Sequence, residues 1–65
     1  MTHDVAVADH GTLVGFTPLT ETAHAWFAEH LSEDAPRMGV TVFAEHRFAE
    51  GICEGMLDDG LRLRS

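Results

Sequence analysis

The stretch VTVFAEHRFAEGICEGMLDDGL, residues 40–61, decides the fold because it contains a strand, a helix and the signal that ends the helix. Residues 40–45 are rich in β-branched and aromatic side chains, which predicts a strand. A helical pattern starts near His46 and ends at Asp58 or Asp59, and Gly60 is well placed for the left-handed conformation that closes a helix. The stretch therefore predicts a strand followed directly by a docking helix.

A first helix is predicted earlier in the chain, over residues 20–31. Thr20 is a good N-cap, and the side chains that follow have the i, i+3, i+4, i+7, i+8 spacing of an amphipathic helix. This stripe consists of Ala23, Trp26, Phe27, His30 and Leu31. His30 lies near its middle, where a neutral imidazole would hydrogen-bond at the edge of the core, and burial there would make its protonation costly in mild acid.

Two strands precede this helix. Residues 4–8 alternate between polar and apolar side chains, and a turn signal separates them from the apolar run at residues 13–16. This pattern predicts a β-hairpin, and Pro18 closes its second strand because proline cannot donate to a ladder. Residues 32–39 indicate a loop.

The LRLR segment, residues 61–64, predicts a short last strand with Leu61 and Leu63 facing inward. The expected order is β-β-α-β-α-β, an α+β fold in which a small mixed sheet carries two helices on one face. Residues 1–65 form a single small domain. The strand, helix, strand order of residues 13–45 favours a right-handed crossover and a parallel pair.

Composition limits the classes of function. The chain has 65 residues and one cysteine, so no internal disulfide supports its small core, and self-association, for example as a homodimer, is an expected way to gain stability. No basic segment precedes an apolar run near the N-terminus, and no window approaches the ~20 apolar residues that cross a bilayer. The expected location is the cytoplasm, with no membrane partner.

Charge points away from nucleic acid. The chain has eleven acidic residues and four arginines, and its net charge is −7. Such a chain repels phosphate backbones and anionic membranes, so direct nucleic-acid binding is not expected. The same charge suits a protein partner with a basic surface, although it also serves solubility alone.

The spacing of His46, Glu50 and Cys53 raises the question of a metal or nucleophile site. Projection at 100° per residue places them along the border of the second helix's core stripe, not in a row that faces a pocket. The core stripe of that helix is predicted to contain Phe48, Ala49, Ile52 and Met56. Tight metal sites pair Cys or His ligands close in sequence, and this chain has no such pair. No catalytic residue, metal ligand or cofactor is therefore predicted.

Six residues are candidates for binding a protein. Glu50, Glu54 and Asp58 follow each other at intervals of four, and this acidic row slightly destabilises its helix by repulsion between like charges. Glu33 and Asp34 lie in the predicted loop at residues 32–39, and Trp26 lies at the edge of the apolar stripe of the first helix. Edge aromatics are frequent at interfaces, although a tryptophan in so small a domain is more often a core residue.

The chain resembles a family of short bacterial proteins, some of them carried on phage or other mobile elements. The shared pattern is T-P-L-T-x-x-A-x-x-W, then E-H-R-[FY], then G-M-x-x-D-G-L, and it covers about four-fifths of the chain. The matching residues are Thr17, Pro18, Leu19, Thr20, Ala23, Trp26, Glu45, His46, Arg47, Phe48, Gly55, Met56, Asp59, Gly60 and Leu61. The resemblance supports the predicted architecture and implies no activity, catalytic residue or ligand.

Three classes of function follow. The leading hypothesis is a small, acidic, non-enzymatic protein-interaction module, and its sharper form is a phage or mobile-element inhibitor that occupies a basic nucleic-acid-binding surface, of the anti-CRISPR or nucleic-acid-mimic type. The sharper form expects Glu50, Glu54, Asp58 and residues 32–34 to make one acidic face. The second class is a self-associating structural or accessory protein, and the third is a metal or redox protein centred on Cys53 and His46.

Overall fold

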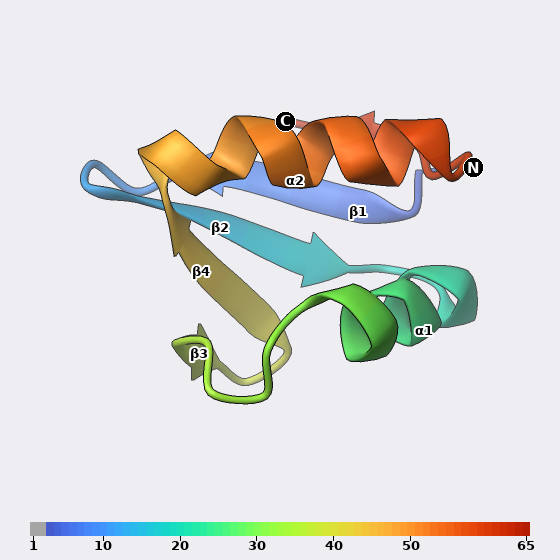
Figure 1. The fold of residues 1–65 in the computed structure, drawn as a ribbon, viewed down its shortest axis with the longest axis horizontal. Helices are drawn as coiled ribbons and strands as arrows, with labels where there is room; N and C mark the ends of the chain where they lie inside the picture. Colours follow the sequence, from blue (N-terminus) through green and yellow to red (C-terminus); the bar gives the residue numbers. More distant parts are fainter. Residues whose placement is uncertain (1–2) are drawn as a thin grey trace.

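The computed structural model describes residues 3–65 and shows five strands and two helices in an α+β arrangement (Figure 1). The predicted class is confirmed, with one additional strand. The elements are β1 (Val5–Asp9), β2 (Leu13–Pro18), α1 (Glu21–His30), β3 (Arg37–Met38), β4 (Thr41–Glu45), α2 (His46–Asp58) and β5 (Leu63–Arg64).

The strands form one mixed sheet in the order β3-β4-β2-β1-β5. The predicted hairpin is present, since β1 pairs antiparallel with β2. The predicted parallel pair between the strands on either side of α1 is wrong, because β2 pairs antiparallel with β4. The cause is β3, which lies in the segment predicted as a loop and forms an antiparallel hairpin with β4. The crossover through α1 thus leads to β3, and the chain turns back before β4 enters the sheet.

The parallel pair lies at the opposite edge of the sheet. β5 runs parallel to β1, with Val5 opposite Leu63. The inward orientation predicted for the last strand agrees with the structure, because Leu61 is buried and Leu63 packs against the core.

The end of α2 follows the prediction for Gly60. Gly60 has φ of +90°, which costs glycine little because it has no Cβ. The N–H groups of Leu61 and Gly60 donate to the carbonyl oxygens of Met56 and Leu57 at 2.9 and 3.0 Å. These two bonds form a Schellman motif, and they turn the chain so that the side chain of Leu61 returns to the core.

Both helices pack on one face of the sheet. The strands contribute Val5, Val14, Phe16 and Val42 to the buried core, the helices contribute Ala23, Trp26, Phe27, Ala49 and Met56, and Leu61 completes it. Phe16 and Met56 are fully buried. Because Phe16 belongs to the central strand, its burial fixes where α1 and α2 meet the sheet.

Asp4 fastens the start of β1 to two distant segments. Its carboxylate accepts a hydrogen bond from the hydroxyl of Thr20 at 2.7 Å and one from the backbone N–H of Arg62 at 3.0 Å. The Thr20 hydroxyl oxygen in turn accepts the N–H of Ala23 at 3.1 Å, which confirms Thr20 as the N-cap of α1. The Thr20 hydroxyl and the Arg62 N–H lower the pKa of Asp4 below its usual 3.8.

We predict that Asp4→Asn lowers the melting temperature at neutral pH by several degrees, because an amide cannot accept both hydrogen bonds. A carboxyl whose folded pKa is lowered stabilises the fold above its unfolded pKa and loses this effect as pH falls through the folded value. The difference between wild type and variant should therefore shrink as pH falls below about 3.8. Thermal melting of wild type and variant from pH 7 to pH 2.5 measures this difference in melting temperature, with Asp58→Asn as an exposed control. Equal melting temperatures at pH 7 would contradict the prediction.

Candidate functional site

A cleft lies between α1 and α2 and opens over β4. Its volume is about 820 Å³. The two helices separate above the sheet: α2 contacts β2 and β4, whereas α1 lies near the C-terminal end of β2 (Figure 1). The lining is mostly apolar and consists of Leu13, Trp26, His30, Leu31, Ser32, Ala35, Pro36, Val42, Phe43, Ala44, Glu45, Phe48, Gly51, Ile52 and Gly55.

One wall of the cleft is a single stripe of α2. Phe48, Gly51, Ile52 and Gly55 have the spacing i, i+3, i+4, i+7, which places them on one side of a helix. Phe48 is 54% exposed, so the prediction that it belongs to the core is wrong. The core side of α2 is centred on Ala49 and Met56. Phe48 is rotated by about 100° from Ala49 and lies over the part of the sheet that neither helix covers.

Two glycines shape this wall. A Cβ built on Gly51 meets no atom within 4 Å, and one on Gly55 would meet the Trp26 ring at 3.4 Å, an ordinary contact distance. Glycine inside a helix destabilises it by roughly 0.5–1 kcal/mol relative to alanine. The packing of this chain therefore does not require glycine at position 51, and its visible effect is to leave the cleft wide and its wall flat.

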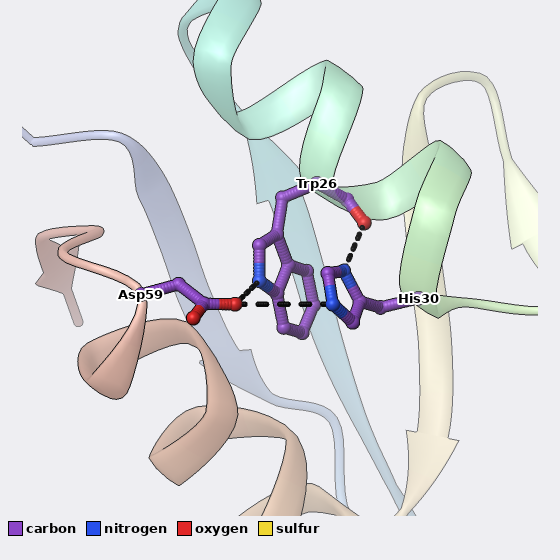
Figure 2. Close-up of polar contacts among 3 residues, drawn as sticks. All are labelled: Trp26, His30 and Asp59. Carbon is purple, nitrogen blue, oxygen red and sulfur yellow. Dashed lines mark hydrogen bonds and ion pairs between the residues drawn. The ribbon is translucent and has the colours of Figure 1, made fainter.

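The opposite wall is built around Trp26. Its indole N–H donates to Asp59 Oδ2 at 2.7 Å, and its ring stacks on the His30 imidazole with centroids 4.2 Å apart and planes at 17° (Figure 2). Trp26 is only 8% exposed, so it is mainly a core residue whose ring edge reaches the cleft. The hydrogen bond joins α1 to the residue that caps α2, and it fixes the angle between the two walls.

His30 differs from its prediction. The ring lies on the exposed side of Trp26, not at a buried core edge, and its side chain is 43% exposed. Its Nδ1 lies 3.0 Å from the carbonyl oxygen of Trp26, and because a carbonyl only accepts, Nδ1 carries the hydrogen. Nε2 lies 3.8 Å from Asp59 Oδ2, so the ring also approaches the residue that accepts the Trp26 indole N–H.

The other end of the cleft carries a charged pair beside Phe48. Arg47 Nε donates to Glu45 Oε1 at 2.9 Å, and the Arg47 guanidinium lies 4.8 Å from the centroid of the Phe48 ring. Glu45 itself lines the cleft. The carboxylate that borders the apolar lining is therefore Glu45, whereas Asp59 is connected to this cleft through the indole N–H of Trp26.

The acidic candidates fall into two separate groups. Glu50, Glu54 and Asp58 are exposed on α2, and Glu33 and Asp34 are exposed in the loop that follows α1. That loop lies at the bottom of the view, whereas α2 lies at the top (Figure 1). The structure thus does not join the two groups into one row, and the cleft lies between their elements.

His46 and Cys53 have separate structural positions. The Nε2–H of His46 donates to the carbonyl oxygen of Gly11 at 2.6 Å and lies 3.4 Å from Asp9 Oδ1, which ties the β1–β2 turn to the start of α2. Cys53 packs against the core; burial, and then the charge of Glu50, raise the pKa of its thiol. A raised pKa keeps the thiol protonated and weakly nucleophilic.

Other classes of site are not evident in the described part of the chain. Among residues 3–65, no three His, Cys, Asp or Glu side chains gather closely enough to hold a metal ion. No helix within the same range is both long and apolar enough to cross a bilayer.

Comparison of the chain with models of protein families, with curated proteins and with solved structures finds no match.

We predict that Gly51→Ala stabilises the protein by about 0.5–1 kcal/mol, because alanine costs less backbone entropy in a helix and its methyl group meets no neighbour. Chemical denaturation measures the change. Gly60→Ala is the matched control with the opposite sign, since its φ of +90° strains any side chain. Destabilisation by Gly51→Ala would show that α2 packs more tightly at this position than the structure indicates.

Proposed function

We propose that this chain is a small, acidic, non-enzymatic protein-interaction module that binds another protein through the cleft between α1 and α2. The observation that carries the proposal is the cleft itself, which has a volume of about 820 Å³, a mostly apolar lining and the half-exposed side chain of Phe48. An exposed aromatic side chain in an apolar surface with a polar border is a common feature of interaction sites.

The chemistry of the lining favours a protein over a small polar ligand. Sites for small molecules bury most of the ligand's surface and orient it with a few precisely placed polar groups. Here His30 and Asp59 already have partners on the same wall, and Glu45 is paired with Arg47. What remains free is apolar area, mainly of Phe48 and Ile52. Each large apolar side chain that a partner covers contributes roughly 1.5–3 kcal/mol.

The sharper inhibitor hypothesis depends on acidic charge. The α2 row of Glu50, Glu54 and Asp58 supports it, because all three are exposed on one helix. Glu33 and Asp34 belong to a different element, so a contact with a basic nucleic-acid-binding surface would use the α2 row and the cleft together. We place the protein in the cytoplasm, a setting that suits a chain with one free cysteine.

The test compares two exposed apolar residues of the same helix. Phe48 and Leu57 are 54% and 57% exposed, but only Phe48 lines the cleft. Immobilised wild type, Phe48→Ala and Leu57→Ala are incubated with lysate of the source cell, and the affinity of each captured protein is then measured in purified form. We expect Phe48→Ala to weaken a genuine partner at least about tenfold and Leu57→Ala to leave it unchanged. Equal capture by all three would contradict a role for the cleft, and unchanged melting temperatures of both variants control for folding.

A further inference from the structure

We infer that the occupant of the cleft is an amphipathic α-helix of the partner protein with basic residues beside its apolar stripe. This inference rests on the proposed function and specifies the class of partner. It depends on three properties of the cleft: the shortage of backbone hydrogen-bonding groups, the shape of the α2 wall, and the charge around the floor.

The backbone argument favours a helix over an extended segment. An extended segment needs external partners for its N–H and C=O groups, and burying them unpaired is costly. The edge of β4 offers few such partners, because β3 pairs with Thr41 and Val42. The Phe43 N–H already donates to the carbonyl oxygen of Pro36 at 2.8 Å. Only the last part of β4, Ala44 and Glu45, extends beyond this pairing. A helix satisfies its own backbone and requires only apolar contact.

The shape of the α2 wall suits a second helix. Gly51 and Gly55 are one turn apart and carry no side chain, while Phe48 and Ile52 project beside them. Helices pack by placing the ridges of one into the grooves of the other, and small residues at a contact let the two axes approach closely. The floor is supplied by Val42 and Ala44 of β4, so a docked helix would complete the layer that α1 and α2 leave open.

Charge selects the partner. Glu45 lines the cleft and accepts Arg47 Nε at Oε1, and α2 carries Glu54 and Asp58 on its exposed side. The whole chain has a net charge of −7. Lysine or arginine residues beside the apolar stripe of a partner helix would meet these carboxylates. A second copy of α2 is a poor occupant for the same reason, because it brings further acidic residues to an acidic rim.

The experiment uses synthetic probes with the full chain. The first probe is a side-chain-crosslinked helix of about 15 residues with leucines at i, i+4 and i+7 and lysine at most other positions. The second has glutamate in place of each lysine. The third keeps the composition of the first but places its three leucines at i, i+2 and i+4, without the crosslink, so that its apolar spacing is that of an extended segment. Fluorescence of Trp26, the only tryptophan, reports binding at the wall of the cleft.

We expect the lysine helix to bind at least about tenfold more tightly than either other probe, and to weaken as salt rises from about 50 to about 500 mM. Gly51→Leu should abolish binding without lowering the melting temperature, because its side chain fills the cleft and leucine favours a helix. Leu57→Ala should bind as wild type does. Binding that survives Gly51→Leu would overturn the assignment of the helix to this cleft.

The other outcomes separate this inference from the proposed function. Equal binding of the lysine and glutamate helices would overturn the basic character of the partner, and tighter binding of the alternating probe would overturn its helical form. Concentration-dependent sedimentation that is lost in Phe48→Ala would identify a second copy as the occupant and also overturn the inference. Failure of all three probes, with capture of a partner that still depends on Phe48, would refute the helix and leave the proposed function standing.

Discussion

The constraint on which the rest of the structure depends is the way in which two short helices share one face of a five-stranded sheet. α1 has 10 residues and α2 has 13, so they measure about 15 and 20 Å along their axes. The two helices separate above the sheet (Figure 1), and Val42 and Ala44 of β4 lie at the floor of the cleft between them. The cleft is the part of the sheet face that lies between the two helices.

Polar bonds at the ends of the helices then set the shape of this uncovered area. Asp4 holds the start of α1 through Thr20, and the Trp26 indole holds the same helix to Asp59 at the end of α2. Without such bonds, a domain of this size would be free to close the helices over its own exposed apolar side chains. The ends of α1 and α2 are instead fixed relative to each other, and Phe48 remains in contact with solvent.

Local signals in the sequence were sufficient for most of the fold and insufficient for the site. Thr20 and Gly60 act through their own backbone and side-chain chemistry, so the start of α1 and the end of α2 could be predicted. β3 has only two residues, too few to show the alternation of a strand. Because β3 was not predicted, the direction of β4 relative to β2 was predicted incorrectly. Phe48 was misplaced because a helical projection finds the apolar side of α2 but does not show how much of that side the sheet reaches. The available signal was Gly51 and Gly55, because two glycines inside an otherwise regular helix indicate a helix face without side chains.

The pairing of β1 with β5 also determines how this domain can be joined to other sequence. Asp4 and Arg62 are hydrogen-bonded neighbours, so the chain enters and leaves the fold at the same edge of the sheet. In the order β3-β4-β2-β1-β5, β2 lies between this pair of strands and β4. A tag, a linker or a whole second domain fused at either end would therefore be joined beside β1 and β5, and an insertion of the unit into a loop of a larger protein would need only a short gap between the two joints.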